Sequence, residues 1–201
     1  GKYSFAEYLL LARRHRDLLT PDTIYHSPHY TLPFGLGPYG LGCRSVVTIH
    51  DTIHLSHPSR ILNPLIAQPL IGSALRRADR VITVSEFSRR ELRRYFPKSS
   101  ARIEVIANGC QAAFRERLDE RRLAEVRLRH GVSAPYCLFV GNAKRHKGGA
   151  ELLEAWRALG SEFGESRPQL VVVGGAFGDR FRAEAVAACG ERGVRFLSGV
   201  S

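Results

Sequence analysis

The chain has 201 residues, of which 44% are hydrophobic, so it can bury a real core in one large domain or two small ones. Its formal net charge of +11 favours anionic partners such as a nucleotide or an anionic lipid, but no zinc-finger spacing or aromatic RNP pattern indicates a nucleic-acid partner. No apolar run approaches the roughly 20 residues that span a bilayer. Four scattered cysteines without a CxxC pair predict reduced thiols in a cytoplasmic protein.

The first half of the chain alternates helical and strand patterns. In chain order we expect a helix over 5–19, strands over 23–26 and 45–50, a helix over 61–78, a strand over 80–84, a helix over 86–96 and a strand over 102–106. Pro64 and Pro69 should kink the second helix or delay its start. Ser85 is placed to cap the third helix. The glycine-rich segment 35–42 has too many breakers for regular structure.

The second half begins with a turn predicted at Asn108 and Gly109, followed by a charged segment that contains one helix, over 119–130. After Pro135 we expect a strand over 136–140, a helix over 150–159, a strand over 169–173, a helix over 179–192 and a strand over 194–197. The strand over 136–140 is a continuous apolar run, so we expect it, together with Cys137, to be buried in the core.

Strands that alternate with helices predict an α/β fold with parallel sheets covered on both faces. The polar break after Asn108 indicates two sheets, with a first lobe over 1–108, a linker and helix over 109–134, and a second lobe over 135–201. In such sheets ligands bind beyond the carboxyl ends of the strands. His26, His50, Ser85 and the turn over 144–147 all fall at such ends, so we expect them to lie near a ligand.

Four residues between the strand over 136–140 and the next helix concentrate positive charge, namely Lys144, Arg145, His146 and Lys147. We call this segment the basic turn. Backbone N–H groups and the positive end of the helix dipole favour phosphate at a helix N-terminus, and lysine and arginine add charge and donors. The basic turn therefore predicts an anion site. The alternative is a solvated basic loop.

The segment His50-Asp-Thr-Ile-His54 resembles the H-E-x-x-H zinc signature, with His57 as a third ligand. That signature needs a helix to place both imidazoles on one face. Residues 46–49 instead predict a strand that 52–53 continue. We therefore expect no metal at this segment, and an ordinary loop histidine stays the alternative for His50.

Two further motifs have an ordinary structural interpretation beside a functional one. Gly174-Gly-Ala-Phe-Gly178 follows a strand but lacks the G-x-G-x-x-G spacing, so we interpret it as a tight strand-to-helix turn near the ligand. Arginines at four positions of the helix over 86–96 form one face: Arg89, Arg90, Arg93 and Arg94. We interpret this face as solvated, with peripheral contact to an anionic membrane as the alternative.

Five short motifs occur in order along the chain: His26-Ser-Pro-His-Tyr-Thr-Leu-Pro, Val46-Val-Thr-Ile-His-Asp51, Ala78-Asp-Arg-Val-Ile-Thr-Val-Ser-Glu-Phe-Ser88, Ile103-Glu-Val-Ile-Ala-Asn-Gly109 and Phe139-Val-Gly-Asn-Ala-Lys-Arg-His-Lys147. Together they resemble the family 4 glycosyltransferases, most closely the bacterial mannosyltransferase-like branch. The resemblance implies a GT-B architecture, in which two Rossmann-like lobes face a cleft. It also implies a nucleotide-sugar donor held mainly by the C-terminal lobe, an acceptor on the N-terminal lobe, and transfer that retains anomeric configuration without an obligatory metal or other cofactor.

The resemblance also implies roles for particular residues. Lys147 resembles the family lysine that neutralises the donor diphosphate, and the arginine that usually precedes it is replaced by His146, with Arg145 one position earlier. Gly141 and Asn142 begin the same phosphate-binding turn. His50 resembles the histidine that contacts the transferred sugar near the reacting carbon, and Asp51 is expected to orient it. Ser85, His26 and Gly174 are expected to line the cleft.

By the same resemblance, a Glu-x7-Glu element would lie beyond Ser201 and an opening strand would precede Gly1. The sequence also contains no methionine. We therefore expect both lobes to be incomplete and the chain alone to be inactive. For the parent enzyme we expect a GDP-mannose or UDP-sugar donor, a saccharide or lipid-linked saccharide acceptor of the cell envelope, and a place at the inner face of the membrane. The alternatives are a non-catalytic anion- or lipid-binding module and a hydrolase with a metal on His50, His54 and His57.

Overall fold

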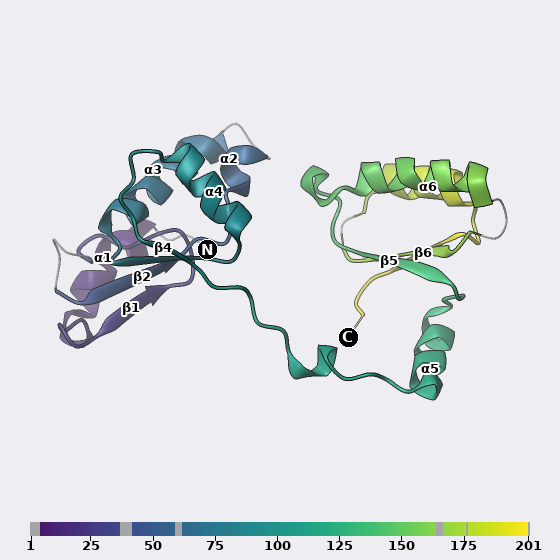
Figure 1. Ribbon diagram of the computed structural model, residues 1–201, viewed down its shortest axis with the longest axis horizontal. Helices are drawn as coiled ribbons and strands as arrows, with labels where there is room; N and C mark the ends of the chain where they lie inside the picture. The colour runs from purple at the N-terminus through teal and green to yellow at the C-terminus, as the bar shows by residue number, and fades with distance from the viewer. Residues whose placement is uncertain (1–4, 37–41, 59–61, 164–166, 176, 201) are drawn as a thin grey trace. The chain divides into compact units, whose positions relative to one another are not determined.

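Two parallel β-sheets organise the chain, one in each of two units, Gly1–Cys110 and Gln111–Ser201 (Figure 1). The computed structural model describes residues 5–36, 42–58, 62–163, 167–175 and 177–200. Every strand pair is parallel. The order in unit 1 is β1 (Ile24–Ser27), β2 (Arg44–Thr48), β3 (Arg80–Thr83) and β4 (Ile103–Val105), and in unit 2 it is β5 (Tyr136–Val140), β6 (Gln169–Val173) and β7 (Val194–Leu197). The α/β class predicted from the alternation of helices and strands is thus confirmed.

Unit 1 places helices between its second and third strands and between its third and fourth strands. Its elements are α1 (Phe5–Arg14), the short 3-10 helix η1 (Arg16–Leu18), β1 (Ile24–Ser27), β2 (Arg44–Thr48), α2 (Ile53–Ser56), α3 (Leu62–Arg77), β3 (Arg80–Thr83), α4 (Glu86–Tyr95) and β4 (Ile103–Val105). Val47 and Ile49, in and just after β2, are fully buried and belong to one cluster with Ile71 of α3 and Leu92 of α4. Because β2 has a strand on either side, its end is a well-fixed place for a functional side chain.

A polar contact fixes the amino ends of β2 and β3. The carboxylate of Asp79 accepts hydrogen bonds from the backbone N–H and the hydroxyl of Ser45, at 2.7 and 2.9 Å. Ser45 is fully buried, and a buried hydroxyl without a partner would cost free energy. This pair therefore stabilises the sheet at the edge away from the carboxyl ends.

Several predictions for unit 1 need correction. The helix over 5–19 is wrong as one piece, because α1 ends at Arg14 and η1 follows a break at His15. Thr52 and Ile53 do not continue β2, since Ile53 begins the single turn of α2. No turn is assigned at Asn108 and Gly109. Helix α3 is continuous through Pro69, and the kink expected there stays a prediction. Ile61 and most of the glycine-rich segment 35–42 lie outside the described residues.

Unit 2 repeats the alternation of strands and helices. Its elements are the 3-10 helix η2 (Ala112–Phe114), α5 (Glu120–His130), β5 (Tyr136–Val140), the 3-10 helix η3 (Arg145–Lys147), α6 (Gly149–Phe163), β6 (Gln169–Val173), α7 (Asp179–Cys189) and β7 (Val194–Leu197). Figure 1 shows α6 lying along one face of β5 and β6. Trp156 of α6 and Ala185 of α7 form a buried cluster there with Leu170 and Val172 of β6. Helices α6 and α7 thus cover that face of the sheet.

The other face of β5 corrects the prediction of a buried strand. Tyr136, Leu138 and Val140 have exposed fractions of 42%, 57% and 68%, and Cys137 is exposed as well. Among the described residues β5 pairs with β6 alone and so forms an edge of the sheet. A continuous apolar run shows that a strand is suited to burial, but it does not show whether a neighbour is present to bury it.

Cys43, Cys137 and Cys189 are free thiols, and the first and last of these are buried. In the described part of the chain, no helix combines the length and the apolar character needed to cross a bilayer.

Candidate functional site

Two glycines meet at the carboxyl edge of the unit 2 sheet. Gly141 follows β5 and donates its N–H to Val173 at 3.0 Å, while Gly174 follows β6 and donates to Leu197 at 3.0 Å. A Cβ built on Gly174 would lie 1.8 Å from the carbonyl oxygen of Gly141, and Gly174 has a φ of +142°. Glycine is therefore required at 174. The structure brings together these two residues, which the sequence predicted as parts of a ligand site.

The basic turn begins two positions after Asn142, with Ala143 between them. The side-chain oxygen Oδ1 of Asn142 accepts a hydrogen bond from the N–H of Lys144 at 3.2 Å. Arg145–Lys147 then form η3, and Gly148 follows with a φ of +74° before α6 begins. The cations thus occupy a separate 3-10 turn ahead of the α-helix, rather than the first turn of the helix itself.

The basic turn has an excess of positive charge that the described residues do not neutralise. Lys144, Arg145 and Lys147 are exposed, and His146 is half-buried. No ion pair in the described part of the chain involves any of these four side chains. Cations next to a helix N-terminus are unfavourable unless an anion is present. Charge and backbone geometry together suit a phosphate group.

An aromatic cluster lies behind the glycine turns, and the sequence analysis did not predict it. The ring centroid of Phe177 is 6.2 Å from that of Phe139, 4.9 Å from that of Phe181 and 6.4 Å from that of Phe196. A Cβ on Gly149 would meet the Phe181 ring at 3.0 Å, so α6 begins in close contact with this cluster. Phe177 belongs to the predicted turn 174–178, of which residue 176 lies outside the described residues. The rings support the backbone of the candidate phosphate site.

Unit 1 places three of the predicted side chains at the carboxyl ends of its strands. His26 lies in β1, and its Nε2 is 2.8 Å from the hydroxyl of Thr48 in β2. His50 follows β2, and its Nε2 is 3.3 Å from the carbonyl oxygen of Pro28. Because a carbonyl oxygen only accepts, Nε2 of His50 donates, which leaves Nδ1 as the basic nitrogen of the neutral ring. Imidazoles from β1 and β2 therefore share this edge of the sheet.

Ser85 is the N-cap residue of α4. Its Oγ accepts a hydrogen bond from the N–H of Ser88 at 3.1 Å, as the N-cap prediction requires. The hydroxyl of Ser88 donates to the carbonyl oxygen of His50 at 3.0 Å, and the hydroxyl of Thr83 donates to that of Ile49 at 2.7 Å. Sequence reasoning missed Thr83 and Ser88, because only the fold brings them to the end of β2.

Asp51 has a local contact. Its Oδ1 accepts a hydrogen bond from the N–H of Ile53 at 3.0 Å. The carboxylate therefore stabilises the start of α2, and within the described residues no hydrogen bond joins it to the imidazole of His50.

A further histidine, also missed by the sequence analysis, lies near the same edge. The ring centroid of His29 is 3.9 Å from that of Tyr30, and the ring of Tyr30 meets that of His54 edge-on at 5.7 Å. Burial lowers the pKa of His29, and the nearby positive charges of His54 and His50 lower it further. This imidazole therefore favours its neutral form.

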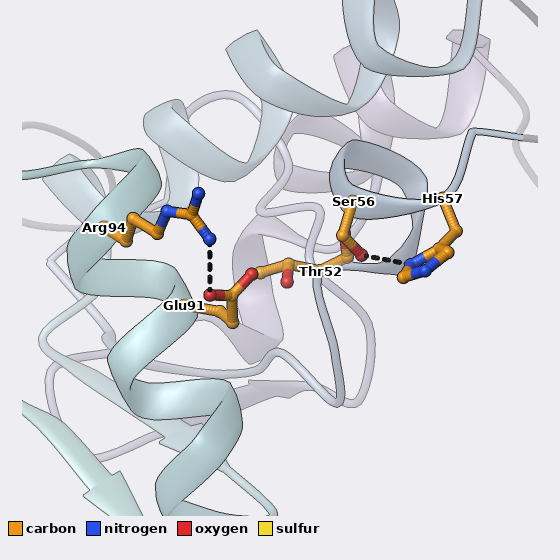
Figure 2. A network of polar contacts seen from close by, with 5 residues as sticks. All are labelled: Thr52, Ser56, His57, Glu91 and Arg94. Atoms are coloured by element: carbon orange, nitrogen blue, oxygen red, sulfur yellow. Dashed lines mark hydrogen bonds and ion pairs between the residues drawn. The ribbon is translucent and has the colours of Figure 1, made fainter. Parts of the chain in front are cut away.

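The three histidines of the zinc-like segment have different partners. His54 contacts Tyr30, while His50 faces Pro28. Nδ1 of His57 lies 3.1 Å from Oγ of Ser56, and Ser56 donates to the carbonyl of Thr52 at 3.3 Å (Figure 2). Within the described residues, no group of three or more His, Cys, Asp or Glu side chains is arranged to hold a metal ion.

The arginine face of α4 is partly paired. Arg89 lies 2.6 Å from Glu86, and Arg94 lies 3.4 Å from Glu91. Figure 2 shows the pair of Arg94 and Glu91 in close-up. Arg89, Glu86 and Arg94 are well exposed, and surface pairs add little stability, whereas the side chain of Glu91 is only 13% exposed. Arg90 and Arg93 are exposed and take part in no ion pair in the described part of the chain.

Known proteins resemble the chain in sequence and in fold. Residues 1–114 match the family described as Glycosyltransferase Family 4. O-antigen chain mannosyltransferase B of Escherichia coli is 28% identical over 145 residues, which is 70% of this chain and 36% of that protein. Alpha-D-kanosaminyltransferase of Streptomyces kanamyceticus is 32% identical over 158 residues, which is 71% of this chain and 41% of that protein. The chain thus spans about two fifths of the length of these relatives.

A solved structure shows the same fold. The crystal structure of HepE from Anabaena in complex with UDP-glucose aligns with a TM-score of 0.56 and 22% sequence identity, over 80% of this chain and 43% of that chain. At this identity the likeness is evidence about the fold alone.

Proposed function

Because the chain belongs to glycosyltransferase family 4, we propose that this protein takes part in transferring a sugar from a nucleotide-sugar donor to a saccharide acceptor, with retention of anomeric configuration. The match over residues 1–114 contains four of the five sequence motifs and confirms the family resemblance. The α/β fold, with a parallel sheet in each unit, is of the GT-B type. The non-catalytic binding module and the metal hydrolase are therefore the weaker alternatives.

One observation supports the donor site most strongly: the basic turn, whose charge the described residues do not neutralise, follows Gly141 at the end of β5. We assign it to the donor diphosphate. Lys147, with Arg145 and His146, would balance the negative charge that develops on the leaving nucleotide, and the effect of such groups is largest in the transition state. Gly141, Asn142 and Gly174 would let the phosphate approach the backbone closely.

In the proposed reaction the bond between the anomeric carbon and the phosphate oxygen breaks, and a bond to the acceptor oxygen forms. The acceptor hydroxyl gives its proton to a phosphate oxygen of the donor, so the chain need not supply a separate base. Unit 1 would contribute the acceptor side, with His50 near the reacting carbon and His26 and Ser85 lining the same edge. Asp51 would act on His50 through the backbone at the start of α2. No metal ion is required in this scheme.

The donor is proposed to be GDP-mannose or a UDP-sugar. The two curated relatives are a mannosyltransferase and a kanosaminyltransferase, and the solved structure contains UDP-glucose. The acceptor is proposed to be a saccharide or a lipid-linked saccharide of a cell-envelope polysaccharide, which would place the reaction at the cytoplasmic side of the membrane.

Calorimetric titration tests the donor site. GDP-mannose, UDP-glucose and UDP-galactose are titrated into a longer, active form of the protein that contains this chain, and one of them should bind with micromolar affinity. Lys147→Ala should weaken that binding by roughly 10- to 100-fold, because it removes a charge-assisted contact to phosphate. Arg192→Ala is the matched control, since it removes one positive charge near the amino end of β7. If both substitutions weakened donor binding equally, the effect would come from the overall charge of the chain, and the assignment of the donor site to the basic turn would be contradicted.

A peripheral membrane contact is a second proposal for unit 1. It rests on Arg90 and Arg93, together with Phe87, which is 65% exposed on the same helix. Basic side chains attract anionic lipid, and an exposed aromatic ring suits the interface. The protein should float with phosphatidylglycerol vesicles but not with phosphatidylcholine vesicles, and the double substitution Arg90→Ala, Arg93→Ala should abolish flotation. Flotation that persists in the double variant would assign the contact to another surface.

A further inference from the structure

Two side-chain hydroxyls reach the end of β2, one from the last residue of β3 and one from the first turn of α4. Thr83, fully buried, donates to the carbonyl oxygen of Ile49, and Ser88, also buried, donates to the carbonyl oxygen of His50. The last residue of β2 with a register partner in β3 is Thr48. The carbonyl groups of Ile49 and His50 therefore lie past the paired part of β2. The hydroxyls of Thr83 and Ser88 donate to them in place of the backbone of a neighbouring strand.

The hydrogen-bond directions around Ser88 separate this role from helix capping. Ser85 alone caps α4, since its Oγ accepts from the N–H of Ser88. The hydroxyl proton of Ser85 goes to Oγ of Ser88 at 3.0 Å. The hydroxyl proton of Ser88 is thus left for the carbonyl of His50, across a separation of 38 residues. The side chain of Ser88 does not contribute the cap, and its own hydrogen bond goes to another element.

His50 is held from two sides as a result. On the β1 side its imidazole donates to Pro28, and on the β3 side its backbone accepts from Ser88. The 3.3 Å contact of the imidazole is longer than the 3.0 Å contact of the backbone. The ring can therefore leave Pro28 for a ligand while the Ser88 bond keeps the backbone in place.

We propose that Ser88 is the positioning residue of His50 in sugar transfer, an inference that rests on the proposed function. The hydroxyl of Ser88 fixes the point from which the imidazole reaches the transferred sugar. Small displacements of a group that acts near a reacting carbon reduce the rate strongly. Ser88 itself touches no substrate in this scheme and acts through His50.

Kinetics on an active, longer form of the enzyme that contains this chain tests the proposal. Ser88→Ala should lower kcat by roughly 10- to 100-fold, with the KM for the nucleotide sugar changed by less than about twofold. Ser88→Thr keeps the hydroxyl and should restore most of kcat. Ser45→Ala is the matched control, because it removes another buried hydroxyl, bonded to Asp79 at the opposite edge of the sheet. It should leave kcat unchanged at a temperature where all variants are folded.

The double variant His50→Ala, Ser88→Ala gives the sharpest comparison. If Ser88 acts through His50, the double variant should be no slower than His50→Ala alone. Multiplied effects of the two substitutions would overturn the proposal, because Ser88 would then act by another route. A Ser88→Ala variant with the kcat of the original enzyme would overturn it as well.

NMR distinguishes failure of this inference from failure of the proposed function. In Ser88→Ala the imidazole resonances of His50 should shift, while in Ser45→Ala they should not. If His50→Ala leaves transfer intact, the role of His50 in the proposed function is wrong, whatever the NMR result. If His50→Ala abolishes transfer but Ser88→Ala leaves both the resonances and kcat in place, the proposed function stands and the positioning role of Ser88 is wrong.

Discussion

A Cβ at residue 174 would lie 1.8 Å from the carbonyl oxygen of Gly141, so the turns after β5 and β6 can exist in this form only with glycine at 174. The neighbouring residue Gly175 provides a control for substitution of Gly174 by alanine. A Cβ on Gly175 would meet no atom within 4 Å. The two neighbouring glycines therefore separate the effect of close backbone approach from the general effect of losing a glycine.

Gly174→Ala should lower the free energy of unfolding by at least about 3 kcal/mol, because the backbone must move and the φ of +142° is strained for any other residue. Gly175→Ala should change it by less than about 1 kcal/mol. Urea denaturation followed by circular dichroism measures both. Similar midpoints for the two variants would show that the turns separate easily.

Arg77, the last residue of α3, should hold the loop that follows β1. Its guanidinium donates to the carbonyls of Leu32, Pro33 and Leu36 and lies 5.1 Å from the ring centroid of Phe34. Arg77→Ala should cost roughly 2–4 kcal/mol of stability, since hydrogen bonds from charged donors are among the stronger ones. Arg77→Lys should recover only part of this stability, because an ammonium group lacks the planar set of N–H donors of the guanidinium group.

Limited proteolysis checks this loop directly. In Arg77→Ala, cleavage within residues 28–36 should speed up relative to cleavage elsewhere in the chain. The neighbouring Arg76 is exposed, and Arg76→Ala should change stability by less than about 0.5 kcal/mol. Identical cleavage patterns for the two variants would show that Arg77 does not anchor the loop.

His29 should make stability depend on pH. Its pKa in the folded chain lies below the ordinary value of 6.5, first because of burial and then because of the positive charges of His54 and His50. Above 6.5 the residue is neutral in both states and its contribution is fully present. As pH falls from 6.5 toward the folded pKa, the unfolded state binds the proton more readily, so stability is lost.

The comparison of His29→Gln with the unsubstituted chain isolates this contribution. Between about pH 7.5 and pH 5 the free energy of unfolding should fall less in the variant than in the original chain. The slopes of the two curves should differ by at most about 1.4 kcal/mol per pH unit, the value for one proton. His15→Gln, at an exposed position, serves as the control. Parallel pH curves for the His29 variant and the original would contradict the prediction.

The cysteines should react with an alkylating reagent at very different rates. Cys137 is exposed in β5, whereas Cys43 and Cys189 are buried. Burial raises the pKa of the Cys43 thiol and raises that of Cys189 to about 11, although Arg167 and Arg157 act in the opposite direction on Cys189. Because the thiolate is the reactive form, iodoacetamide should modify Cys137 well before these two, as peptide mass spectrometry can measure. Equal rates in the folded chain would show that both cores open readily.

Local patterns were enough to predict much of the fold. The strand over 194–197 matches β7 at both ends. The N-cap at Ser85 was predictable because the N–H group that it accepts from belongs to Ser88, only three residues away. The basic turn was recognisable because its cations, the preceding strand and the following helix are contiguous in the sequence. Parallel pairing followed from the order of strands and helices.

Interactions between distant segments were not predictable in this way. The bonds from Ser88 to His50 and from Arg77 to Leu32 join residues 38 and 45 positions apart, and the sequence gives no sign of which serine or arginine has such a partner. The exposure of β5 depends on the absence of a neighbour among the described residues, which hydrophobicity does not report. The break at His15 shows that an amphipathic pattern can continue past the end of an α-helix.

Among the described residues β5 is an edge strand with exposed apolar side chains, and both features favour self-association of the chain. Backbone groups on an edge strand can accept a strand from another molecule, and Tyr136, Leu138 and Val140 would add contact area to that pairing. Mutual repulsion at a net charge of +11 opposes it, and salt screens this repulsion. Light scattering of the isolated chain should therefore rise with ionic strength, and a charged residue at 138 should suppress the rise.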